Sequence, residues 1–128
     1  MLGSSALVQV HVFGGVLRAG SATLIGDGLI ESARAIHADV LLCGAHAVTD
    51  GVLTETSPEV AAVKRALMQA ASAKRLLVDA SKFRPRTFMR VAALSEFNEL
   101  ITDDGVPPEE VERVRALGVK LTVVRASA

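Results

Sequence analysis

Short apolar runs alternate along this chain with longer stretches of helical periodicity, and no other feature of the sequence constrains the fold as strongly. Each run has the length of a strand, and each intervening stretch is long enough for a helix that leads back to a parallel strand. This order predicts right-handed crossover units, and so an α/β fold with a mainly parallel sheet and helices on both faces. The 128 residues fit one such domain.

Five segments are predicted strands. Residues 7–13 have a period of two that places Val8, Val10 and Val12 on one face. The next three segments are continuous apolar runs, as expected for strands that are covered on both faces. These three segments and the last strand lie at 40–43, 75–79, 100–102 and 119–124.

Three segments carry helix signals. Asp27 can cap the first helix, and Ser57 followed by Pro58 is a strong start for the second. Gly118 stands where a left-handed residue would end the third. The predicted spans are 27–38, 58–73 and 107–117.

Charge and aromatic content argue against direct binding of nucleic acid. The 14 Lys and Arg residues balance the 14 Asp and Glu residues, and four Phe are the only aromatic residues. The single cysteine, Cys43, cannot form an internal disulfide and is expected to be a small buried side chain. No apolar run has the length of a membrane span, and the start lacks the positive region of a signal peptide. We therefore expect a cytoplasmic protein that does not contact the membrane.

Three loops that follow predicted strands contain glycine or polar residues. In an open parallel sheet, ligands bind outside the carboxyl ends of the strands. Lys64 lies at the margin of the buried face of the second helix, from which its ammonium could reach an anion. The rule on strand ends selects Gly14, Gly15, Gly44, Ala45, His46, Asp79 and Lys82, and Lys64 joins these candidates from the second helix.

Each of these residues also has a purely structural interpretation. The glycines could form ordinary turns, and His46 could be a satisfied structural histidine. The stem of Lys64 could lie on apolar surface with its ammonium in water, and Asp79 could cap the turn that follows it. The residue pattern alone leaves both interpretations open.

Other chemistry finds no support in the sequence. Neither a dinucleotide fingerprint nor a P-loop is present, and no serine lies in a nucleophile elbow. His11 and His37 have no carboxylate or thiol at the spacing of metal ligands. We therefore expect no catalytic residue, no metal and no cofactor.

Seven blocks of this sequence resemble, in order and approximate spacing, the effector-sensing domain of DeoR-type bacterial transcriptional regulators. The resemblance extends from residue 7 to residue 124, and its later blocks are the more specific ones. The blocks are 13–18 (FGGVLR), 24–26 (LIG), 38–45 (ADVLLCGA), 51–54 (GVLT), 59–68 (EVAAVKRALM), 76–83 (LLVDASKF) and 100–103 (LITD).

The resemblance implies a Rossmann-like fold, similar to that of sugar-phosphate isomerases and CoA transferases. It implies a non-enzymatic sensor that binds a phosphorylated sugar or related metabolite and thereby alters operator affinity, in a homo-oligomer. The implied effector-binding residues are Gly14, Gly15, Gly44, Ala45, His46, Lys64, Asp79 and Lys82.

The family also has segments that do not precede Leu7 in this sequence. They are a helix-turn-helix domain, through which such regulators contact DNA, and a first half-sheet whose loop holds the phosphate of the ligand. We therefore expect residues 7–128 to be the C-terminal part of the sensing domain, a partial domain. Residues 1–6 are expected to be a disordered or artificial start.

A second departure from the family bears on catalysis. His46 stands where related sensors and the isomerases often carry an acid, which argues against proton abstraction of the isomerase type. Two alternatives to the regulator remain. One is a sugar-phosphate isomerase-like enzyme, and the other is a subunit-contact module of the same fold.

Overall fold

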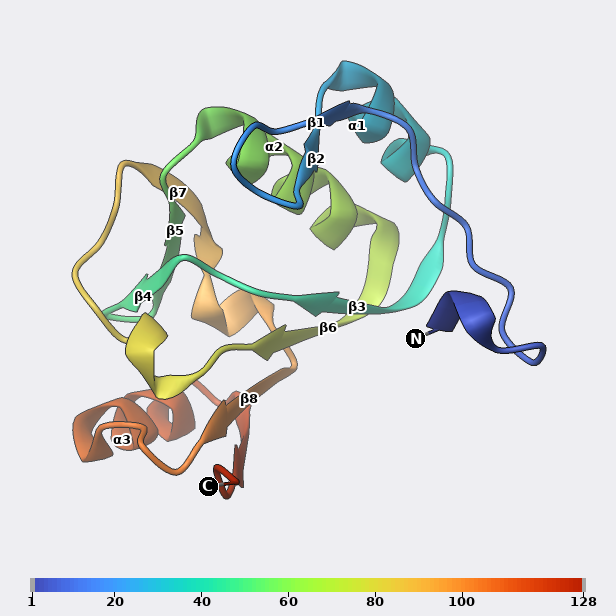
Figure 1. Cartoon of the computed structure of the whole chain (residues 1–128). Helices are drawn as coiled ribbons and strands as arrows, with labels where there is room; N and C mark the ends of the chain where they lie inside the picture. Colours follow the sequence, from blue (N-terminus) through green and yellow to red (C-terminus); the bar gives the residue numbers. More distant parts are fainter. Residues whose placement is uncertain (1, 128) are drawn as a thin grey trace.

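The computed structural model describes residues 2–127 and confirms the α/β class (Figure 1). Its largest sheet has four parallel strands in the order β3-β6-β8-β9. Met1 and Ala128, which belong to the two expected segments 1–6 and 7–128, lie outside the described residues. The four strands are Ala38–Cys43 (β3), Ala71–Leu77 (β6), Glu99–Asp103 (β8) and Lys120–Val124 (β9).

Three helices accompany this sheet: Asp27–Arg34 (α1), Pro58–Ala70 (α2) and Pro108–Ala116 (α3). α2 leads into β6, α3 connects β8 to β9, and α1 packs against α2. Buried residues from both connecting helices join the strand residues in a single apolar cluster. Ala61 and Met68 of α2, Val114 of α3, and Leu76 and Leu100 of the sheet belong to it.

The described residues cover one face of the four-stranded sheet. The chain visits the strands in the order in which they lie in the sheet, so right-handed crossovers all fall on the same side. Leu76 is fully buried, whereas Val40 and Leu42 are 43% and 62% exposed. Within residues 2–127 the expectation that 40–43 is covered on both faces is therefore wrong. The sequence placed helices on both faces of the sheet, whereas α2 and α3 pack on the covered face and α1 packs on α2.

A second, antiparallel sheet was not predicted. It contains Ala47–Thr49 (β4), Val52–Glu55 (β5) and Met89–Ala93 (β7), in the order β4-β5-β7. Asp50 and Gly51 join β4 to β5 with positive φ angles of 52° and 75°. An Asp-Gly pair between apolar residues is a strong hairpin signal, and it could have revealed this turn.

The remaining elements are short. Val16–Leu17 (β1) and Leu24–Ile25 (β2) form a two-stranded antiparallel ribbon beside α2. Single 3₁₀ turns lie at Leu2–Ser4 (η1), Ala80–Lys82 (η2) and Leu94–Glu96 (η3). No helix within residues 2–127 is long and apolar enough to cross a membrane.

The predicted strand at 7–13 is absent. Leu7 is 96% exposed and Val12 79% exposed, and the segment pairs with no strand of the described chain. A period of two indicates an extended backbone, but a strand forms only where a second strand takes up its hydrogen bonds.

Three helix boundaries also differ from the prediction, and one of them is the end of α1, which lies at Arg34 and not near residue 38. Gly26, with φ 116°, occupies the N-cap of α1, and Asp27 is the first helical residue and caps nothing. α2 ends at Ala70 because Ala71 is already extended and opens β6. The capping role of Ser57 is confirmed, since its hydroxyl accepts a hydrogen bond from the Val60 N–H at 3.3 Å. The left-handed Gly118 after α3 is confirmed too.

The one-sided burial of the main sheet predicts unequal costs for two leucine truncations. Leu76→Ala should lower the free energy of unfolding by about 2–5 kcal/mol, because it opens a cavity under α2 and α3. Leu42→Ala, on the exposed face of the neighbouring strand, should change it by less than about 0.5 kcal/mol. Urea denaturation of both variants measures the difference, and equal losses would contradict one-sided burial.

Candidate functional site

Two of the loops selected from the sequence lie together at the carboxyl ends of β3 and β6. β3 runs into the turn Gly44–His46, β6 runs into η2, and both leave the sheet toward the same side of Figure 1. Arg84, just after η2, donates a hydrogen bond from Nε to the carbonyl of His46 at 2.9 Å. The hydroxyl of Thr49 donates to the carbonyl of Arg84 at 2.5 Å. The two loops are therefore fastened to each other.

Lys64 reaches the same turn from the side of α2. Its ammonium donates to the carbonyl of Gly44 at 2.7 Å and to Oε1 of Glu55. The same oxygen of Glu55 accepts a hydrogen bond from the backbone N–H of His46 at 3.1 Å. The structure thus brings Lys64, Gly44 and His46 together around a carboxylate, and Ala45 between them is buried in the core.

Glu55 is the residue of this group that sequence reasoning missed. It ends β5, and 91% of its side chain is buried, while the side chain of Lys64 is 20% exposed. The ammonium of Lys64 is therefore paired and mostly buried, and the interpretation that placed it in water is wrong. The signal that could have drawn attention to Glu55 is a carboxylate just before the strong helix start at Ser57.

Cys43 is the last residue of β3 and directly precedes this turn. It is 8% exposed, and its thiol donates to the carbonyl of Gly44 at 3.2 Å. Burial raises the pKa of this thiol, and the nearby ammonium of Lys64 opposes that shift only in part. Cys43 is therefore the small, protonated, buried side chain that its apolar surroundings predict.

Asp79 has the capping role that was one of its two interpretations. Its Oδ1 accepts hydrogen bonds from the backbone N–H of Ser81 at 2.8 Å and from the hydroxyl of Ser81. The hydrogen bond from that hydroxyl is the main reason why the pKa of Asp79 lies below its usual value. Lys82 is half-buried, and within residues 2–127 its ammonium has no hydrogen-bond or ion-pair partner.

Asp103, at the end of β8, supports the same loop from the neighbouring strand. Its two carboxylate oxygens accept hydrogen bonds from the backbone N–H groups of Ala80 at 2.6 Å and Gly105 at 3.0 Å. A cavity of about 310 Å³ lies against Asp79 and Asp103. The carboxyl ends of β6 and β8 therefore border a hollow with a fixed acidic rim.

Gly14 and Gly15 lie apart from these loops. Gly15 is in close contact with its neighbours: an added Cβ would come within 2.8 Å of the carbonyl of Ile25 and 3.5 Å of Leu29. Nothing approaches the corresponding position at Gly14. The adjacent Phe13, however, lines a cavity of about 410 Å³ that Lys64 also lines. The glycine pair is thus near the α2 side of the candidate site and does not touch η2.

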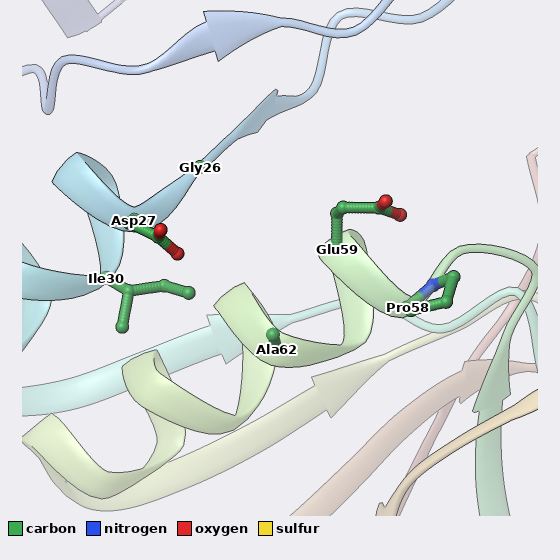
Figure 2. A pocket seen from close by; sticks show the side chains of 6 residues that line it. All are labelled: Gly26, Asp27, Ile30, Pro58, Glu59 and Ala62. Carbon is green, nitrogen blue, oxygen red and sulfur yellow. The ribbon is translucent and has the colours of Figure 1, made fainter.

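Figure 2 shows a further cavity, of about 230 Å³, between the first turns of α1 and α2. Asp27 and Glu59 lie on its walls, and none of the residues selected from the sequence lines it. The hydroxyl of Ser57 donates to the carboxylate of Glu59 at 2.7 Å and lowers its pKa. With two carboxylates on its walls, this cavity is unsuited to an anion.

Metal ligands do not gather anywhere in the described chain. Residues 2–127 contain no group of three or more His, Cys, Asp or Glu side chains that could hold a metal ion. The candidate site is built from backbone groups, one compensated ion pair, the carboxylates of Asp79 and Asp103 and the ammonium of Lys82.

Comparison with known proteins identifies a family. A family model described as the DeoR C-terminal sensor domain matches residues 1–104. The chain is 31% identical, over 75% of its length, to the HTH-type transcriptional repressor GlcR of Bacillus subtilis. It is 28% identical, over 87% of its length, to the HTH-type transcriptional regulator GlpR of Haloferax volcanii. It is 29% identical, over 91% of its length, to a protein of Escherichia coli O157:H7 named as a candidate repressor of the aga operon.

The chain spans less than half the length of these relatives. It covers 37% of the Bacillus protein and 44% of each of the other two.

The cap formed by Asp79 predicts a pH-dependent stability. The pKa of Asp79 is lowered in the folded state, so its carboxylate stabilises the fold above the usual aspartate pKa. This contribution is lost as the pH falls through the lower, folded value. Asp79→Ala should therefore lower the Tm at neutral pH, and its difference from the unaltered chain should shrink in acid. Thermal unfolding between about pH 7 and about pH 3 measures this.

Lys82→Ala serves as the control for this series. Within the described residues the ammonium of Lys82 makes no hydrogen bond or ion pair and acts on Asp79 only as a nearby positive charge, so Lys82→Ala should lower the Tm at neutral pH far less than Asp79→Ala does. A difference for Asp79→Ala that stays constant down to the lowest pH would contradict the capping role.

Proposed function

The chain belongs to the family of DeoR C-terminal sensor domains, and we propose that it senses a phosphorylated sugar or a related metabolite for a transcriptional regulator. The family match over residues 1–104 carries this proposal. The names of its relatives support it, since they are transcriptional repressors or regulators. So does the location of the fastened loops, because open parallel sheets bind ligands outside the carboxyl ends of their strands.

The effector-binding residues of this proposal are drawn from both loops, from α2 and from the Gly14–Gly15 pair. Lys82 supplies an ammonium that makes no hydrogen bond or ion pair within residues 2–127, and a phosphate forms charge-assisted hydrogen bonds with such a group. The Gly44–His46 turn supplies backbone groups, and Lys64 fixes its carbonyl side. The full set consists of Gly14, Gly15, Gly44, Ala45, His46, Lys64, Asp79 and Lys82.

Binding would act on DNA through a change of affinity. An effector that binds one arrangement of the sensor more tightly than another shifts the regulator by the difference, typically 1–3 kcal/mol. Contact with the operator falls to a helix-turn-helix domain of the kind that the names of the relatives give. The proposed regulator is a cytoplasmic homo-oligomer without enzymatic activity.

One observation favours a second candidate function, a sugar-phosphate isomerase. Such an enzyme needs a carboxylate base beside a lysine, and Glu55 and Lys64 supply that pair. Turnover assays on pentose and hexose phosphates separate the two functions. Isomerisation that Glu55→Gln abolishes would favour the enzyme, and absence of turnover by a chain that binds the sugar phosphate favours the sensor.

The sensor proposal predicts a charge-dependent loss of binding at Lys82. In a titration calorimeter, the tightest ligand of a panel of pentose and hexose phosphates should bind Lys82→Met about ten-fold or more weakly than the unaltered chain. Lys74→Met is the matched control, because Lys74 lies in the middle of β6 and is not one of the proposed effector-binding residues. Equal affinities for Lys82→Met and Lys74→Met would contradict the role of Lys82, and a panel without any ligand would contradict the sensor function.

A further inference from the structure

The ion pair of Glu55 and Lys64 is the most buried pair between residues 2 and 127. Its side chains are 9% and 20% exposed, whereas every other ion pair in this part of the chain has a partner that is at least 38% exposed. Burial of two charges is costly unless hydrogen bonds satisfy them, so the pair must be held by its surroundings.

The groups that hold the pair are backbone groups at the two ends of the Gly44–His46 turn. Lys64 donates to the carbonyl of Gly44, and Glu55 accepts from the N–H of His46. The pair therefore holds the turn from the α2 side, while Arg84 holds the carbonyl of His46 from the η2 side. Any ligand that touches the turn on the α2 side meets this pair.

The pair is electrically compensated. A phosphate drawn to the ammonium of Lys64 would be repelled by the carboxylate of Glu55, which lies in direct contact with that ammonium. A hydroxyl group meets no such opposition, because it can donate to a carboxylate and accept from an ammonium. The chemistry of the pair thus fits the hydroxyl-bearing part of a sugar phosphate better than its phosphate.

One carboxylate oxygen of Glu55 takes no part in these contacts. Oε1 accepts from both Lys64 and His46, while Oε2 accepts no hydrogen bond from any residue of the described chain. This oxygen is not sealed from solvent, although the residue as a whole is 7% exposed. A nearly buried carboxylate oxygen without a partner is a place where a ligand donor gains a charge-assisted hydrogen bond.

We propose that Glu55 determines specificity by accepting a hydrogen bond from an effector hydroxyl through Oε2, with Lys64 as the residue that positions it. The phosphate then lies away from the pair, on the side of Lys82, whose ammonium makes no ion pair within the described residues. This inference rests on the proposed sensing of a sugar phosphate, and it assigns an orientation to the ligand in that site.

The test compares two probes on one variant. Glu55→Gln should bind the tightest sugar phosphate of the panel about ten-fold more weakly, because it loses the charged acceptor. Its affinity for inorganic phosphate should not fall, because the phosphate position lies elsewhere. Thermal shift and calorimetric titration measure both affinities, with Glu112→Gln, an exposed residue of α3, as the matched control.

A second variant guards against misfolding of the first. Glu55→Gln leaves Lys64 without its partner, whereas Glu55→Gln combined with Lys64→Met removes both charges together. The double variant should show the same selective loss of sugar-phosphate affinity.

The outcomes separate this inference from the proposed function. If the unaltered chain binds no sugar phosphate, the proposed function fails. If it does bind and both variants keep that affinity, gain affinity, or lose both probes equally, the assignment of Glu55 fails while the sensor function stands.

Discussion

The handedness of the strand connections determines most of this structure. Because the chain moves across the main sheet in one direction, right-handed crossovers place α2 and α3 on the same face. Because the helices cover only that face, buried and more exposed side chains alternate along β6 and β8. Leu76 and Leu100 are fully buried, and their neighbours along each strand are more exposed. It also directs α2 across the end of β3, which brings Lys64 within reach of the turn that leaves this strand.

The turn after β3 is where the parallel sheet gives way to the antiparallel one. β4 and β5 form a hairpin that returns the chain to this turn, and Glu55 stands at its last position. The carboxylate therefore comes from the antiparallel sheet, the ammonium from a helix and the carbonyl from the turn that follows a strand of the parallel sheet. The ion pair and its two backbone hydrogen bonds can therefore form only when all three elements have reached their folded positions.

Local signals explain what the sequence could predict. Ser57 with Pro58, and Gly118, mark helix ends through contacts within a few residues, and the apolar runs at 40–43 and 100–102 identify β3 and β8. The segment 7–13 carries an equally clear pattern but has no partner strand in the described chain. Glu55 escaped notice because its meaning depends on Lys64 and His46, which only the folded chain brings to it.

The passage from α2 to β6 has a mechanical consequence. α2 ends at Ala70 and β6 begins at Ala71, so no connecting residue separates helix from strand. Hinges are loop or terminal residues that absorb changes of dihedral angle. A junction without a linker has few dihedral angles that can change in this way. Lys64 and the Asp79 loop therefore lie on one continuous rigid segment. A displacement at either of them is transmitted to the other through β6.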